Sequence, residues 1–287
     1  MIVSVCSDKG APGVTTVATA LALVWPGDKV LVEADPSGAD LPFRLRRSDS
    51  GAWLNPDPSI ASLAAVARLG LPAGGIPAYA QPTSLGVPVI AGALTAERFS
   101  PLKSLWPQIA EVLSAGSGTV LCDLGRVQPG HAALPVARAS AVVLLVARAD
   151  LGGLFHLRER VVELAQSVGD PSRPVNPVAV LVTGPPKTRS KALAETAALL
   201  ESVGSPAEVV GFVPDDRQGA EDLWAGVVTR RLAGSPLIRS VRQIAEHMLR
   251  TRPDFASPDA PALPLTTVVS EPLSDSSAPT VVVGGAR

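Results

Sequence analysis

The sequence predicts an α/β protein whose doubly wound, mostly parallel sheet of about seven strands is flanked by helices. Short apolar runs rich in β-branched residues alternate with longer segments whose apolar residues recur at helical spacing. A glycine-rich turn follows the first apolar run, and a helical segment follows that turn at once. Strands that alternate with helices are typical of a parallel sheet covered on both faces. No internal repeat is visible.

The expected strands are apolar runs bounded by turn residues or charges. They cover residues 2–6, 29–34, 87–91, 119–122, 139–147, 178–183 and 207–213. The run 139–147 is the most apolar, as expected of a strand that is buried on both faces. Cys6 and Cys122 end two of these runs and form neither a disulfide framework nor a metal motif, so we expect both in the core.

The expected helices are segments with an amphipathic apolar repeat. They cover residues 17–25, 59–69, 102–113, 154–168, 191–203, 218–225 and 237–250. In the last segment the apolar face carries Leu237, Val241, Ile244 and Met248, and the opposite face is charged. We expect this helix to dock on the core of the domain and not on a membrane.

Composition indicates one domain over residues 1–251 and a tail over residues 252–287 that is predicted to be disordered. Of the 287 residues 46% are apolar and 18% charged, which is enough apolar material for a large core. The formal net charge of −1 argues against a DNA partner. Since neither a signal peptide nor a run of membrane-spanning length is visible, we expect a cytoplasmic protein with at most a peripheral membrane contact.

The turn after the first strand is the strongest candidate for a binding site. Residues 8–16 read Asp-Lys-Gly-Ala-Pro-Gly-Val-Thr-Thr and separate an apolar run from a helical segment. Glycines allow backbone N–H groups to gather round an anion, and the start of a helix adds partial positive charge. The pattern therefore predicts a phosphate-binding loop; the alternative is a strand-to-helix turn that holds no ligand.

This loop resembles the deviant phosphate-binding loop of the ParA/MinD family of partitioning and positioning ATPases, K-G-G-x-G-K-T-[ST]. Lys9 falls on the family's signature lysine, which reaches phosphates across a nucleotide-sandwich dimer, and Thr15 falls on the hydroxyl that holds Mg²⁺. Val14 stands where the family has its second lysine, and an apolar side chain cannot bond a phosphate. The resemblance implies nucleotide binding by Lys9, Gly10, Ala11, Pro12, Gly13, Val14, Thr15 and Thr16.

Two strand ends carry acids that fit the same family. Asp35-Pro36 resembles the second half of the family's D-x-D-P-x-G, with Glu33 in place of the first acid. The resemblance implies that Asp35 places or activates the attacking water and adds to the metal site; the alternative is a polar turn. Asp123 ends a later strand as a Walker B carboxylate does, so Thr15, Asp35 and Asp123 are the implied magnesium ligands. Arg126 follows, either as a replacement for the missing cation or as a surface residue.

The last strand ends in Gly-Phe-Val-Pro-Asp-Asp, which resembles the family's G-x-I-P-x-D beside the base, and this implies that Pro214 and Asp215 contact the nucleotide. The preceding strand ends in Thr183 and Gly184, where family members often have an adenine-reading Asn. Base specificity is therefore open.

The resemblance covers residues 1–251 and implies a MinD-like protein that binds ATP or ADP with Mg²⁺ and acts as a homodimeric positioning or partitioning switch. Lys9 and Asp35 are the implied catalytic residues, and the missing loop cation implies weak or absent hydrolysis. The alternative is a pseudo-ATPase scaffold that recruits proteins of pilus, secretion or division machinery without nucleotide turnover. A metabolic enzyme is not favoured, because the three histidines, His131, His156 and His247, are isolated in the sequence.

Overall fold

The computed structural model of the chain describes residues 1–9, 12–70, 74–170, 172 and 176–251. The predicted tail over residues 252–287 lies outside the described residues, as do Gly10 and Ala11 of the loop.

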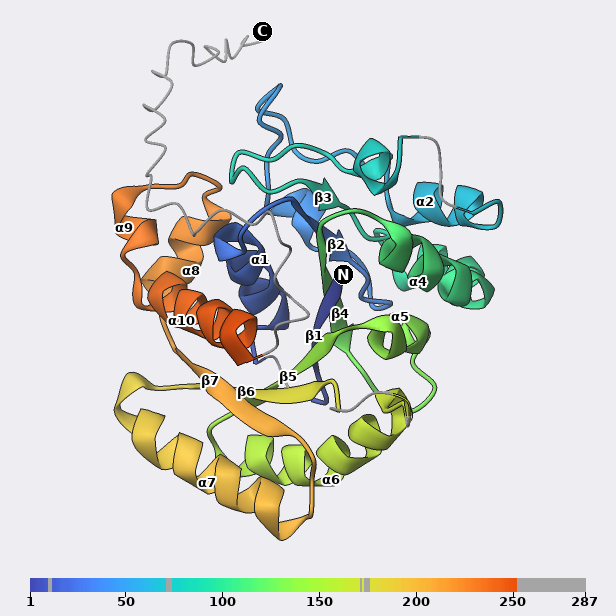
Figure 1. Cartoon of the computed structure of the whole chain (residues 1–287). Coiled ribbons are helices and arrows are strands. Elements are labelled where there is room, and N and C mark those ends of the chain that lie inside the picture. The colour runs from blue at the N-terminus through green and yellow to red at the C-terminus, as the bar shows by residue number, and fades with distance from the viewer. Residues whose placement is uncertain (10–11, 71–73, 171, 173–175, 252–287) are drawn as a thin grey trace, which may run out of the picture.

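The core of the fold is one seven-stranded sheet with the order β3-β2-β4-β1-β5-β6-β7 (Figure 1). Every pairing between these strands is parallel, which confirms the predicted fold class. The strands are β1 (Ile2–Ser7), β2 (Lys29–Glu33), β3 (Val89–Ile90), β4 (Thr119–Arg126), β5 (Val142–Arg148), β6 (Val178–Gly184) and β7 (Glu208–Pro214). Because β1 lies at the middle of the sheet, the loop that follows it opens at the centre of one sheet edge.

Helices cover both faces of the sheet, and each face has its own apolar cluster. One face is packed by α1 (Val14–Val24), α8 (Arg217–Trp224), α9 (Arg230–Ala233) and α10 (Pro236–Thr251), which lie together in Figure 1. The other is packed by α2 (Ile60–Ala67), α4 (Trp106–Ala115), α5 (Leu134–Ala139), α6 (Leu151–Val168) and α7 (Arg189–Ser202). Both cysteines are buried in the core, as predicted.

Several element boundaries differ from the sequence-based expectation. The strand expected at 119–122 continues to Arg126, so Asp123 lies within β4. The strand expected at 139–147 begins only at Val142, because the helix α5 occupies the residues up to Ala139. The helix expected at 102–113 is divided into a 3₁₀ segment, Ser100–Leu105, and α4. The short helices α3 (Ala96–Phe99) and α9 were not predicted.

The last described helix docks on the core as expected. In α10 the side chains of Leu237, Val241, Ile244 and Met248 are all buried, and the helix packs against α1 and β7. None of the helices in the described part of the chain combines the length and the apolar character that crossing a membrane requires.

Candidate functional site

The first helix begins directly at the predicted loop. Gly13 precedes α1 with a left-handed φ of 90°, a conformation that costs a glycine little, and no side chain caps this helix end. Helix α1 starts at Val14 and not at residue 17, so the last loop residues form its first turn. Uncapped N–H groups at a helix start favour an anion, and this is the position predicted for phosphates.

Beside the start of α1 lies a cavity of about 330 Å³ at the ends of β2 and β4. Thr15, Asp35 and Asp123 all line it, so the structure brings the three predicted magnesium ligands together. Glu33 and Asp40 line the same cavity and make it strongly acidic. Among the described residues no three His, Cys, Asp or Glu side chains form a metal cluster. The hydroxyl of Thr15 and the carboxylates of Asp35 and Asp123 fit Mg²⁺, which takes one or two carboxylates and completes its octahedral coordination with water and phosphate oxygens.

Asp123, which lines this cavity, has one carboxylate oxygen without a hydrogen-bond partner among the described residues. Its Oδ1 accepts the backbone N–H of Gly125 at 2.9 Å, whereas Oδ2 is buried and has no hydrogen-bond partner among the described residues. Burial raises the pKa of Asp123 to about 6, and the nearby Thr15 hydroxyl lowers it in part. A buried carboxylate oxygen without a partner is costly, and a bound cation would satisfy it.

Asp35 is held between its own turn and the end of β4. The backbone N–H of Ser37 donates to its Oδ1 at 2.7 Å. Its Oδ2 lies against Gly125, so closely that a Cβ added to this glycine would be 1.9 Å away. Gly125 also has a φ of +60°, so glycine is needed both for the backbone conformation and for the close approach. No pattern in the sequence indicates this contact.

Glu33 is a structural acid that organises the wall of the cavity. Its side chain is buried, and Oε1 accepts the backbone N–H groups of Asp40 at 2.6 Å and Leu41 at 2.9 Å. Its Oε2 accepts the N–H of Gly92 at 3.0 Å. Burial raises the pKa of Glu33 to about 7 against the opposing effect of these three donors. Glu33, which occupies the position of the first acid in the resembling family, therefore links the turn after β2 to the turn after β3.

We expect Glu33→Gln to destabilise the fold by about 1–3 kcal/mol, because the amide NH₂ would face a backbone N–H that now donates to a carboxylate oxygen. The free energy of urea unfolding measures this effect, and Glu111→Gln on the exposed side of α4 is the matched control. Equal stability of the two variants would contradict the assigned role of Glu33.

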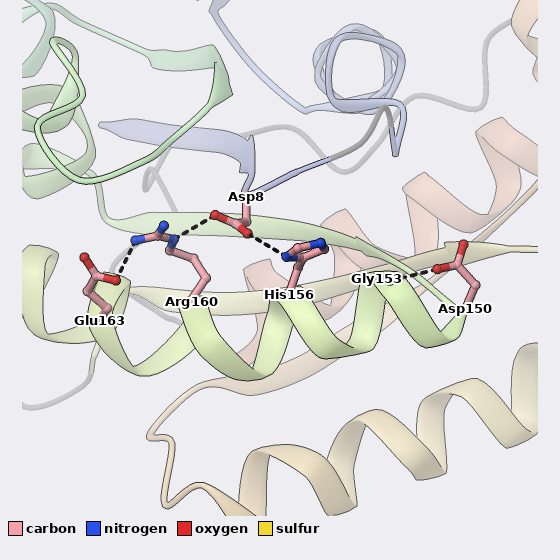
Figure 2. A network of polar contacts seen from close by, with 6 residues as sticks. All are labelled: Asp8, Asp150, Gly153, His156, Arg160 and Glu163. Atoms are coloured by element: carbon pink, nitrogen blue, oxygen red, sulfur yellow. Dashed lines mark hydrogen bonds and ion pairs between the residues drawn. The ribbon is translucent and has the colours of Figure 1, made fainter.

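Figure 2 shows how the start of the loop is fastened to α6. Oδ1 of Asp8 accepts a hydrogen bond from Nε of Arg160 at 2.8 Å, and its Oδ2 lies 3.7 Å from Nδ1 of His156. Arg160 also pairs with Glu163 at 2.6 Å. His156, isolated in the sequence, is thus part of a network. No local pattern indicates this network, because Asp8 lies 152 residues before Arg160 and only the fold brings the two together.

Lys9 is exposed and lies apart from the predicted magnesium ligands. It lines a second cavity of about 400 Å³ together with Asp8, Arg126, Arg148 and His156. Arg126 reaches this place because it pairs in register with Ser7, the last residue of β1. Lys9, Arg126 and Arg148 therefore line the cavity beside α6, and none of them lines the acidic cavity.

Val14 does not face a binding site. Its side chain is only 7% exposed and joins the apolar cluster formed by α1, α10 and their face of the sheet. Among the other predicted loop residues, Pro12 is buried and Thr16 is half-buried, and neither lines the acidic cavity.

The residues predicted to contact the base lie at the end of β7, the outermost strand on one side of the sheet. Asp215 follows β7, its N–H donates to the carbonyl of Gly184 at 2.7 Å, and its carboxylate pairs with Arg148 at 3.1 Å. Neither Pro214 nor Asp215 lines the acidic cavity. Thr183, at the end of β6, is buried, and its hydroxyl has no partner among the described residues.

No protein-family model matches the chain, and no curated protein matches it by sequence. Solved structures match its fold. The ParA family ATPase of Chlorobium tepidum TLS is 15% identical, with a TM-score of 0.66 over 86% of this chain and 98% of that chain. The cell division ATPase MinD of Pyrococcus furiosus is 19% identical, with a TM-score of 0.63 over 87% of this chain and 98% of that one.

A third match is the septum site-determining protein MinD of Pyrococcus horikoshii OT3, whose structure was solved in complex with Mg-ADP. It is 15% identical, with a TM-score of 0.63 over 89% of this chain and 98% of that chain. The chain therefore has the fold of the ParA/MinD ATPases, as the sequence predicted.

Proposed function

We propose that this chain is a ParA/MinD-like nucleotide-binding protein that takes ATP or ADP with Mg²⁺ and acts as a dimerising positioning or partitioning switch with weak or absent hydrolysis. One observation carries the proposal. Thr15, Asp35 and Asp123 line one cavity at the start of α1, and a buried oxygen of Asp123 has no hydrogen-bond partner among the residues that the structure describes. The fold match to a MinD protein complexed with Mg-ADP supports it.

The donor set fits magnesium bound through a nucleotide. In the proposed complex the Thr15 hydroxyl and the Asp123 carboxylate hold the ion, Asp35 positions the attacking water, and backbone N–H groups of the loop and of the first turn of α1 bind the phosphates. Magnesium would offset the negative charge that develops on the phosphoryl group. Lys9 would act on the nucleotide of a second copy, since within its own chain it lies at a different cavity from the magnesium ligands.

Weak hydrolysis follows from the place of Val14. The side chain belongs to the core, so the loop offers no ammonium to the phosphates from this position. Preorganised cations are among the largest contributions to phosphoryl transfer, and their loss slows it.

Calorimetric titration of the parent with ATP and ADP, with and without Mg²⁺, tests this proposal. We expect both nucleotides to bind only with Mg²⁺. We also expect Val14→Lys to hydrolyse ATP faster than the parent, because its long flexible stem can carry the ammonium out of the apolar cluster and to the loop. Val14→Met, of similar length but without the ammonium, is the matched control and should not gain hydrolysis. If neither the parent nor Val14→Lys binds either nucleotide, the proposal is wrong.

The second candidate function is a scaffold without nucleotide turnover that recruits a protein of a positioning or secretion system. The burial of Val14 in the core favours it, as do two exposed apolar side chains on α6, Leu151 and Phe155. A MinC:MinD complex from Aquifex aeolicus has a similar fold, with a TM-score of 0.57 at 14% identity. A parent that binds no nucleotide while Val14→Lys gains both binding and hydrolysis would support the scaffold.

A further inference from the structure

The segment between β2 and α2 carries exposed aromatic side chains among arginines. Its residues 43–53 include Phe43, which is 65% exposed, and Trp53, which is 48% exposed. An antiparallel bridge between Arg46 and Trp53 closes the blue loop at the top of the domain in Figure 1. Exposed apolar side chains that lie near one another mark an interaction site, whereas scattered ones need no explanation.

The exposed ring of Trp53 supports an arginine. The guanidinium carbon of Arg46 lies 3.9 Å from the centre of this ring, and its Nη1 donates to the carbonyl of Gly51 at 3.0 Å. Stacking on a ring fixes the plane of a guanidinium and leaves the N–H groups at its edges able to bind a carboxylate. The other N–H groups of Arg46 have no partner among the described residues.

The two neighbouring arginines of the segment are already neutralised by acids. Arg44 pairs with Asp40 at 3.2 Å, and Arg47 pairs with Asp49. Within the described part of the chain no carboxylate pairs with Arg46. Arg46 therefore supplies an uncompensated positive charge beside an exposed aromatic ring.

The same surface continues onto the end of α8. The guanidinium carbon of Arg44 lies 4.8 Å from the centre of the Trp224 ring, and the carbonyl of Arg46 accepts the N–H of Ser84 at 3.0 Å. The hydroxyl of Ser84 lies against the turn that leads into Val227, which is 43% exposed. Two distant parts of the chain thus contribute exposed apolar side chains to one surface.

We propose that this surface is a docking face for an acidic segment of a partner protein. A carboxylate of the segment binds Arg46, and a neighbouring apolar side chain of the segment packs on the exposed apolar groups. The charge and the apolar surface are complementary to such a segment, and Trp and Arg are enriched among the residues that dominate binding energy. The docking face consists of Phe43, Arg46, Trp53 and Val227.

One uncompensated arginine in this segment decides against two other anionic partners. Near an anionic bilayer one arginine contributes only about 1 kcal/mol, and stable attachment requires a second signal. A nucleic acid is held by several phosphate contacts, which one cation does not supply. A peptide carboxylate needs a single guanidinium, which binds it through two parallel hydrogen bonds.

Fluorescence anisotropy of a labelled peptide of repeated Glu-Phe-Pro, titrated with the full chain in the absence of nucleotide, tests this. We expect Arg46→Gln to weaken binding roughly tenfold, as for the loss of hydrogen bonds to a charged group. Trp53→Ala should weaken it as well, because Arg46 loses its support, and Trp53→Phe should recover most of the affinity. Arg98→Gln removes the same charge from an exposed position on α3 and, as the matched control, should stay within about twofold of the parent.

Three results would overturn the inference. They are no binding of the peptide by the parent, equal binding by the parent and Arg46→Gln, and equal affinity of the parent for repeated Lys-Phe-Pro. Phosphatidylserine vesicles or an oligothymidylate that bind the parent in place of the acidic peptide would also overturn it. Thermal unfolding verifies that the variants fold, as expected for changes of exposed side chains. Because no nucleotide is present, the result is independent of the proposed nucleotide site.

Discussion

Gly125→Ala is expected to abolish binding of Mg²⁺ with nucleotide in an otherwise folded protein. The new Cβ would lie 1.9 Å from Oδ2 and 2.1 Å from Cγ of Asp35, so the carboxylate must leave its present position. The φ of +60° adds strain of about 1–2 kcal/mol for any residue with a Cβ. Calorimetry with Mg·ADP, together with thermal unfolding, measures the two effects separately.

Gly130→Ala is the matched control for the backbone strain. Gly130 lies in the same connection, with a φ of +74°, and an added Cβ would meet nothing within 4 Å. This variant should lose a similar stability and keep its nucleotide affinity. In the Asp35→Ala/Gly125→Ala double variant the clash is gone, so its stability should exceed the sum expected from the two single changes. Equal nucleotide affinity of Gly125→Ala and Gly130→Ala would show that the position of Asp35 is unimportant.

Asp123→Asn is expected to stabilise the chain without magnesium, by an amount that grows with pH. Burial raises the pKa of Asp123 from 3.8 to about 6, so the folded state binds more protons than the unfolded state between these values. The parent therefore loses stability as the pH rises through this window, whereas the amide does not titrate. At about 1.4 kcal/mol for each pKa unit, the advantage of the variant approaches roughly 3 kcal/mol above pH 6 and is small near pH 4.

Urea unfolding of the parent and of Asp123→Asn across this pH range, in the presence of EDTA, measures the difference directly. Taking the difference cancels the titration of groups that do not interact with Asp123; Glu33 does interact with it, so part of the difference reports the coupling of these two acids. Mg·ADP should raise the unfolding midpoint of the parent and leave that of the variant unchanged, because the amide has lost the anionic oxygen that holds the ion. A stability difference independent of pH would mean that Asp123 is not a strained buried acid.

The secondary structure was predictable where local pattern decides it. The run 178–183 is apolar up to its last residue and rich in β-branched side chains, and β6 follows this prediction to within one residue. Element ends were harder, because a strand continues for as long as its neighbour offers backbone partners. Thus β4 reaches Arg126 by pairing with Ser7 of β1, which lies more than a hundred residues away.

Part of the site was also predictable. Thr15, Asp35 and Asp123 each stand at a strand end or a helix start, and parallel strands bring such ends to one edge, so sequence order was enough to place them together. The close approach of Asp35 to Gly125 was not predictable. It depends on the distance between a side chain and a turn, which no local pattern encodes.

The sequence by itself determined the parallel α/β fold, the glycine-containing turn between the first strand and the first helix, and the presence of Val14 where the resembling family has a lysine, because these follow from periodicity and residue identity. Only the tertiary structure decided that Val14 belongs to the core, that the Glu33 carboxylate accepts backbone N–H groups, and that one oxygen of Asp123 has no partner within the described part of the chain. The physical reason is that burial and hydrogen-bond pairing are properties of the packed chain. A carboxylate that the fold surrounds with backbone donors stabilises the structure, whereas one left without donors is suited to bind an ion.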